Sequence, residues 1–149
     1  MKHSIGKNNR GFTLVELVMT VIIAVIVMAI GVPYYQSYAM NTNLKAAARD
    51  LVGDIMNLKE RSIAENATYT ILIDIWQNRY TIQPTGQIKK IASFGAVNLS
   101  STNLPGNKIT FQTRGTMSSG AIVLTNNRGS RATVTTLISG RTYVSFTLK

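Results

Sequence analysis

With 149 residues, the chain is long enough for one membrane-spanning element and one modest domain. It contains no cysteine, which excludes a disulfide framework and a cysteine-based metal site. The formal net charge is +10 at pH 7, and its uneven distribution suggests an anionic partner such as DNA, an acidic protein surface or phospholipid headgroups.

All acidic residues lie in the first half of the chain. After Ile75 there is none, whereas nine basic residues follow. They are Arg79, Lys89, Lys90, Lys108, Arg114, Arg128, Arg131, Arg141 and Lys149. We therefore expect the C-terminal half of the chain to carry a positive field that attracts anions.

A short basic segment, residues 1–11, precedes a long apolar one. Residues 12–32 form a run of 21 residues in which Glu16 is the only charged side chain. As a helix this segment would span about 30 Å, the thickness of the hydrocarbon core of a bilayer. Basic residues precede the span and none follows until Lys45, which predicts a cytoplasmic N-terminus and a C-terminal domain on the other side of the membrane.

Gly11 precedes the apolar segment, whereas the small residue at the cleavage site of a secretory signal peptide follows the apolar core. Cleavage after Gly11 would leave the apolar segment on the mature protein. This arrangement resembles the leader of type IV prepilins and type II secretion pseudopilins, and the matching residues are Gly11, Phe12, Thr13, Leu14, Glu16 and Leu17. The resemblance implies cleavage between Gly11 and Phe12 by prepilin peptidase and N-methylation of Phe12. A plain N-terminal membrane anchor is the alternative.

Glu16 is the expected assembly contact. After cleavage Phe12 would carry a positive α-amino group, and Glu16 would lie one helical turn away. A carboxylate in a low-dielectric setting needs a partner, which an ammonium group can supply. The resemblance implies that this partner is Phe12 of a neighbouring subunit in a filament. The alternatives are pairing with the chain's own amino terminus, or extension of the side chain to the membrane interface.

The apolar segment, residues 12–33, is expected to continue into an amphipathic helix, residues 34–66. Pro33 should interrupt the helix, because proline removes a backbone donor and clashes with the preceding turn. In the family it resembles, a proline here is associated with curvature of the helix, and marking the membrane boundary is an equally good interpretation. Tyr34, Tyr35 and Tyr38 follow at the expected interface. The periodicity predicts an apolar stripe of Leu44, Ala48, Leu51, Ile55 and Leu58.

Strand-like alternation begins after Asn66. Strands are predicted at residues 68–75, 79–83, 108–112, 121–125, 131–137 and 141–148, and residues 84–107 should form an irregular connection with one or two short strands. The expected fold class is α+β, with a long N-terminal helix packed on an antiparallel β domain, residues 67–149. Residues 109–115, residues 122–124 and the pair Gly140-Arg141 before the closing strand resemble the GspH/FimT branch of the pilin superfamily. The resemblance therefore implies the pilin fold.

The sequence offers little for catalysis. His3 is the only histidine and precedes the expected cleavage site, and there is no cysteine. The β domain has one acid, Asp74, so that neither a carboxylate pair nor a Ser-His-Asp triad can form there. We predict a protein that is not an enzyme and that holds no metal or cofactor.

The open question is what the basic residues bind. Residues 126–131 read as a hairpin tip that carries Arg128 and Arg131, while Arg141 opens the last strand. Gly140-Arg141 matches the first half of a Gly-Arg-x-Arg motif associated with DNA-binding FimT-type proteins, but Tyr143 stands where the second arginine would be. These three arginines are therefore candidate contacts for DNA or another anion. Contacts with acidic neighbouring subunits, or solubility alone, are the alternatives.

Together these features predict a minor pseudopilin or minor pilin of the GspH/FimT type. It would be a single-pass protein of the bacterial inner membrane with a periplasmic C-terminal domain. It would assemble with other pilin-like subunits through its N-terminal helix, near the tip of a type II secretion pseudopilus or type IV pilus, and support protein secretion or pilus biogenesis. One alternative is a DNA-binding minor pilin for DNA uptake in natural transformation, and another is a monomeric, membrane-tethered β domain.

Overall fold

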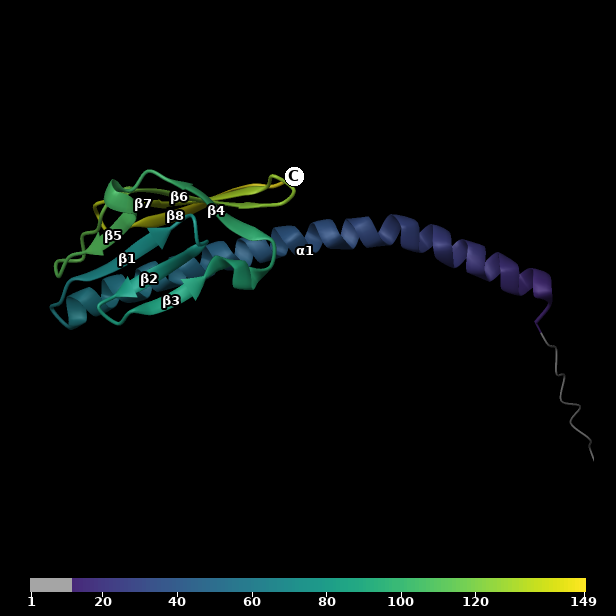
Figure 1. The fold of residues 1–149 in the computed structure, drawn as a ribbon, viewed down its shortest axis with the longest axis horizontal. Coiled ribbons are helices and arrows are strands. Elements are labelled where there is room, and N and C mark those ends of the chain that lie inside the picture. Colours follow the sequence, from purple (N-terminus) through teal and green to yellow (C-terminus); the bar gives the residue numbers. More distant parts are fainter. Residues whose placement is uncertain (1–11) are drawn as a thin grey trace, which may run out of the picture. The chain divides into compact units, whose positions relative to one another are not determined.

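A computed structural model describes residues 12–149 of the chain, so that the expected leader and Gly11 lie outside the described residues. The chain divides into two compact units, the first ending at Gln36 and the second comprising Ser37–Lys149. One long helix, α1, runs through both, and the strands β1 to β8 belong to the second unit (Figure 1).

The helix α1 (Leu14–Ala64) confirms the expected long N-terminal helix. Thr13 caps its start, since the Thr13 Oγ1 accepts a hydrogen bond of 3.2 Å from the backbone N–H of Glu16. At its end Asn66 adopts a φ of 47°, and the Ala67 N–H donates to the Ser62 carbonyl oxygen at 3.2 Å. A left-handed residue with this hydrogen bond is a common way to close a helix, and asparagine tolerates that conformation.

Pro33 lies inside α1, and the expected interruption of the helix there is wrong. A proline in a helix interior costs ~3 kcal/mol or more through its missing donor and its ring. Helix propagation is cooperative, so intact hydrogen-bonded turns on both sides can keep the flanking residues helical. The N-terminal part of α1 is long and apolar enough to cross a membrane, judged by length and composition.

The second half of α1 packs through one face on the β-strands. Its buried apolar residues are Leu44, Ala47, Ala48, Leu51, Ile55 and Leu58, which confirms the predicted stripe. Strand residues such as Ile71, Ile109, Ile122 and Leu124 complete the same core. Spacings of three and four place these helical side chains on one side of α1, so that burial of the stripe fixes which face of the helix meets the sheets.

The strands form two antiparallel four-stranded sheets. The first has the order β3 (Gln87–Lys90), β2 (Arg79–Gln83), β1 (Tyr69–Asp74) and β5 (Lys108–Phe111). The second has the order β4 (Val97–Thr102), β6 (Gly120–Asn126), β7 (Arg131–Thr136) and β8 (Thr142–Thr147). The α+β class is thereby confirmed.

The connection at residues 84–107, where the sequence predicted one or two short strands, contains two, β3 and β4. Two short 3₁₀ helices, Ile91–Phe94 and Pro105–Asn107, flank β4. Sequence order does not reveal how the strands are shared between the sheets, because β5 pairs with β1 and β4 pairs with β6. Asn78 links the sheets: its Nδ2 donates to the Val97 carbonyl oxygen at 2.9 Å, and its Oδ1 accepts from the Leu99 N–H at 2.7 Å.

A polar clamp ties the first sheet to α1. The Lys89 Nζ on β3 lies 2.8 Å from a carboxylate oxygen of Asp54 and 3.2 Å from one of Asp50. The buried Tyr80 hydroxyl on β2 donates to Asp54 at 2.5 Å. Burial and these hydrogen bonds raise the pKa of Tyr80 above its ordinary value. Burial acts to lower the pKa of Lys89, but hydrogen bonds with Asp54 and Asp50 outweigh it and the pKa is raised.

Candidate assembly and anion-binding sites

The start of α1 presents an apolar surface with one carboxylate. Within residues 12–35 the large hydrophobic side chains, from Phe12 to Tyr35, are all between 48% and 81% exposed in the isolated chain. Glu16 lies in the first helical turn, where a negative charge interacts favourably with the helix dipole. Within the described residues its carboxylate has no ion-pair partner. The described residues therefore leave this surface uncovered and supply no cation to Glu16.

Only part of the predicted processing site and assembly contact lies within the described residues. Gly11 lies outside the described residues, so the bond between Gly11 and Phe12 is not described. Phe12 precedes α1, and its side chain is 81% exposed. Residues 12–16 therefore lie at the head of the apolar helix, as the sequence predicted, and the chain's own described residues do not cover them.

The predicted hairpin tip is present, and it is fastened to α1. In the turn between β6 and β7, the Asn126 Oδ1 accepts hydrogen bonds from the N–H groups of Arg128 and Ser130 at 3.1 and 3.0 Å. The Asn126 Nδ2 in turn donates to the Asn41 Oδ1 on α1 at 3.0 Å. The Arg128 guanidinium donates to the Ser37 hydroxyl. Arg128 is thereby placed beside the first turn of α1 that belongs to the second unit.

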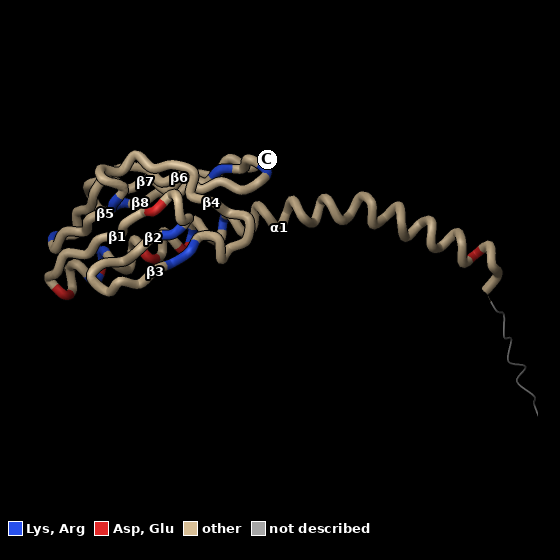
Figure 2. The backbone as a smooth tube through the Cα atoms, viewed as in Figure 1, with Lys and Arg blue, Asp and Glu red and all other residues tan. Residues whose placement is uncertain are grey.

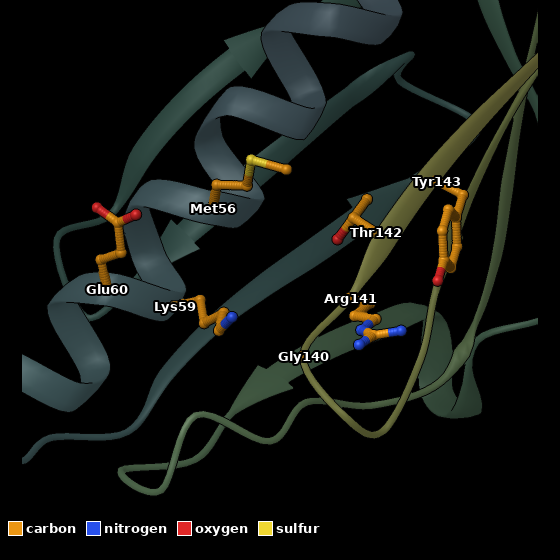
Figure 3. Close-up of a pocket in the computed structure, with 7 residues that line it drawn as sticks. All are labelled: Met56, Lys59, Glu60, Gly140, Arg141, Thr142 and Tyr143. Atoms are coloured by element: carbon orange, nitrogen blue, oxygen red, sulfur yellow. The ribbon is translucent and has the colours of Figure 1, made fainter.

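Arg141 lies in a different place, on the turn between β7 and β8. It lines a groove of about 300 Å³ between α1 and β8, together with Met56, Lys59, Glu60, Gly140, Thr142 and Tyr143. Figure 3 shows Met56 and Lys59 directed toward β8 and the Glu60 carboxylate directed away from it. The Lys59 ammonium group packs against Gly140, since a Cβ atom built there would lie 3.2 Å from the Lys59 Nζ. The groove therefore carries two cations.

The three predicted arginines do not form one patch. Arg131 begins β7, three residues after Arg128. Arg141 lies in the turn that joins β7 to β8, at the other end of the β7–β8 hairpin. Asn41, which holds the Arg128 turn, and Lys59, which lies beside the Arg141 turn, are 18 residues apart on α1, or about 27 Å at the helical rise. A protein that makes about 6–10 phosphate contacts with duplex DNA needs a cation for each of them. Neither end of the hairpin offers that many cations by itself.

Sequence reasoning missed both the contribution of Lys59 to the groove and the clamp around Lys89. Lys59 reads as part of the polar face of an amphipathic helix, and nothing in the local pattern indicates that the turn at Gly140 lies against it. Lys89 lies 35 residues beyond Asp54, within a segment that looked irregular. Both contacts depend on strand pairing between distant segments, which periodicity does not report.

Two family profiles match the chain. Residues 47–140 match the family described as type II transport protein GspH, and residues 6–32 match the prokaryotic N-terminal methylation motif. The first match covers well over half of the 149 residues. The chain belongs to the GspH family. The second match includes Gly11, Phe12 and Glu16, the residues on which the predicted leader rests.

Solved structures show the same fold. The minor pseudopilin EpsH from the type 2 secretion system of Vibrio cholerae matches with a TM-score of 0.60 and 13% identity, over 70% of this chain and 97% of that one. The type IV minor pilin FimU of Pseudomonas aeruginosa PAO1 matches with a TM-score of 0.56 and 13% identity, over 72% of this chain and 92% of that one. No curated protein sequence gives a significant match. The GspH-family chain therefore has the pilin fold, as the sequence resemblance implied.

Proposed function

We propose that this GspH-family protein is a structural minor pseudopilin or minor pilin subunit. In this proposal it is inserted in the inner membrane with its C-terminal domain in the periplasm, and prepilin peptidase cleaves it after Gly11 and methylates Phe12. The mature subunit assembles with other pilin-like subunits near the tip of a filament and supports protein secretion or pilus biogenesis. The role is that of a building block rather than an enzyme, in keeping with the family.

The observation that carries the proposal is the exposed apolar helix with a single carboxylate at its head. Such a surface is stable in two environments, the membrane and the interior of a bundle of like helices. A charged carboxylate costs ~2.5–3.5 kcal/mol at the centre of a membrane span and less near its edge. Pairing with the new amino group of Phe12 in a neighbouring subunit would offset this cost. Glu16 would therefore favour the assembled state over the membrane-inserted one.

The proposal covers both filament types. EpsH belongs to a type 2 secretion system and FimU to type IV pili, and the chain matches both folds at the same sequence identity. In the pilin superfamily, which the sequence resembles, both filament types assemble through an N-terminal apolar helix. Deletion of the gene from its own host, followed by separate assays of protein secretion and of surface pili, would assign the filament.

Replacement of Glu16 tests the assembly role. Glu16→Ala should abolish incorporation into sheared filament fractions, detected by immunoblot, while the protein remains in the inner-membrane fraction. Thr20→Ala is a matched control, because Thr20 is a second polar side chain in the span, one turn beyond Glu16, and its hydroxyl donates to the Leu17 carbonyl oxygen of its own helix at 2.8 Å. Normal incorporation of Glu16→Ala would contradict the assembly role.

DNA binding is not part of this proposal, because the structure separates the three predicted arginines into two groups. A gel-shift experiment on the full-length protein in detergent tests the alternative directly. A complex at low salt that disappears when Arg128, Arg131 and Arg141 are changed to glutamine, but not when Lys108 and Arg114 are changed, would reinstate DNA binding.

A further inference from the structure

Three cations gather at one end of the second sheet. Arg128 lies in the turn between β6 and β7, Arg131 begins β7, and Lys149 follows β8. The Lys149 side chain reaches this turn, since a Cβ atom built on Gly129 would lie 3.8 Å from the Lys149 Nζ. All three side chains are exposed. We call this group, Arg128, Arg131 and Lys149, the basic tip; basic segments mark this end of the sheet near the label C in Figure 2.

The basic tip is held in place by buried polar side chains. Asn126 and Ser130 are 5% and 0% exposed. The Ser130 Oγ donates to the Asn41 Oδ1 on α1 at 2.8 Å and accepts from the Lys149 N–H at 2.9 Å. The Asn41 Nδ2 donates to the Lys149 carbonyl oxygen at 3.2 Å. Burying polar groups is unfavourable unless they are hydrogen-bonded, so this network fixes the tip against one turn of the helix.

The turn of α1 beside the tip comes directly after the apolar segment. Ser37, which accepts the hydrogen bond from Arg128, follows Pro33 by four residues. Four residues span about 6 Å as a helix and at most about 14 Å when extended. The polar headgroup layer on each side of a bilayer is roughly 6 Å thick. If residues 12–32 span the membrane, Ser37 lies five residues beyond the end of the span, and the helical rise along α1 puts it near the outer edge of the headgroup layer.

The charges around the tip are one-sided. After Glu16, the acids of α1 begin at Asp50, which is 13 residues beyond Ser37, or about 20 Å along a helix. Asp50 and Asp54 are already paired with Lys89. A carboxylate at the end of Lys149 would offset one of the three positive charges and leave the tip cationic. Guanidinium and ammonium groups bind phosphate well, and arginine can do so with two parallel hydrogen bonds.

We propose that the basic tip binds the anionic phospholipid headgroups of the membrane in which the subunit is anchored. This inference rests on the proposed membrane span of residues 12–32. Acidic protein surfaces and DNA would also suit cations, but the tip is fastened to Ser37 and Asn41, which follow the proposed span within nine residues. The contact is available only while the subunit is in the membrane. It would therefore orient the C-terminal domain on the bilayer before assembly and be released when the subunit enters the filament.

The absence of cysteine in the natural sequence makes a site-specific probe simple to introduce. We would label Asn127→Cys, in the exposed turn beside Arg128, with a fluorophore in the full-length protein. The labelled protein is placed in nanodiscs of phosphatidylcholine, with or without phosphatidylglycerol, that contain a lipid carrying a headgroup-attached nitroxide quencher. Each cation near an anionic surface strengthens binding to that surface about fivefold. Phosphatidylglycerol should therefore increase quenching severalfold, and 0.5 M salt should reverse the increase because it screens the charges.

Charge replacement identifies the residues. Arg128→Gln, Arg131→Gln and Lys149→Gln together should reduce quenching in phosphatidylglycerol discs to the phosphatidylcholine level. The matched control changes three exposed cations elsewhere, Lys90, Lys108 and Arg114, to glutamine and should leave quenching high. Melting temperatures of both variants verify that the domain remains folded.

The possible failures are distinguishable. Protein that enters the discs but is quenched equally with and without phosphatidylglycerol would overturn the headgroup contact alone, as would equal losses in the tip variant and the control. Protein that enters neither type of disc would overturn the membrane span of the proposed function and this inference with it.

Discussion

The Lys89 clamp permits a sharp test of how the first sheet is held on α1. Its ion pairs are 2.8 Å with Asp54 and 3.2 Å with Asp50, and the three side chains are between 18% and 37% exposed. In exposure, these ion pairs are intermediate between an exposed pair, which contributes ~0–1 kcal/mol to stability, and a buried pair, whose disruption costs ~3–5 kcal/mol. Lys89→Met keeps an apolar stem and leaves two carboxylates one helical turn apart without their cation. We expect the free energy of unfolding to fall by ~2 kcal/mol.

A loss of that size lowers the melting temperature of a domain of this size by roughly 6–12 °C. The assay is thermal and urea unfolding of the full-length protein in detergent, followed by circular dichroism. Lys90→Met is the matched control, because Lys90 is the next residue of β3, is exposed and has no ion-pair partner among the described residues. This control should change the stability by less than ~0.5 kcal/mol.

A combined variant separates charge from packing. Lys89→Met together with Asp50→Asn and Asp54→Asn should recover part of the lost stability, because no unpaired carboxylate remains. If Lys89→Met is as stable as Lys90→Met, the clamp contributes nothing and the reasoning is refuted. If the combined variant is no more stable than Lys89→Met, lost packing rather than unpaired charge explains the effect.

Three further predictions concern the packing of the second unit and are checked by urea unfolding. Gly140→Ala should lower the free energy of unfolding by more than ~1 kcal/mol, because φ is 79° and the new Cβ would collide with the Gly115 carbonyl oxygen. Gly53→Ala, with open space around it, should raise the free energy of unfolding by ~0.5–1 kcal/mol. Ile55→Ala should lower the free energy of unfolding by ~2–5 kcal/mol, because Ile55 is 0% exposed, whereas Met56→Ala, at a residue that is 48% exposed, should lower it by less than ~1 kcal/mol. Equal losses would contradict the assigned core face of α1. Burial and hydrogen bonds with two aspartates raise the pKa of Tyr80 in the folded protein, so that Tyr80 loses its proton at a lower pH in the unfolded protein than in the folded one. The free energy of unfolding should therefore fall above about pH 10, by up to ~1.4 kcal/mol per pH unit. Tyr80→Phe should flatten this fall, and an unchanged pH profile would show that Tyr80 is not the group responsible.

The elements of the fold were readable from the sequence where the signal is local. The spacing of Leu44, Ala48, Leu51 and Ile55 gave the buried face of α1, and alternation of β-branched residues gave the strands to within one or two residues. Pro33 was misread because its local cost was not weighed against the cooperativity of a long helix. The division of strands between two sheets could not be predicted, because pairing β5 with β1 closes a loop of more than thirty residues that leaves no periodic trace.

The candidate sites also differ in whether their signal is local in the sequence or depends on the tertiary structure. The leader motif and Glu16 are contiguous in the sequence, and the methylation-motif match covers them. The arrangement of the arginines is a tertiary property. A count of basic residues predicted one positive face, whereas the hydrogen bonds of Asn126 and Asn41 place Arg128 at one end of the domain, and the turn at Gly140 places Arg141 at the other.

The most direct test of the central claim is the N-terminus of the mature protein. The protein should be purified from membranes of a host with an active prepilin peptidase and its N-terminal peptide sequenced by mass spectrometry. The account predicts that the first residue is Phe12, bearing one N-methyl group, and that no peptide from residues 1–11 remains attached. A chain that retains Met1, or one cut after a later small residue, would contradict it.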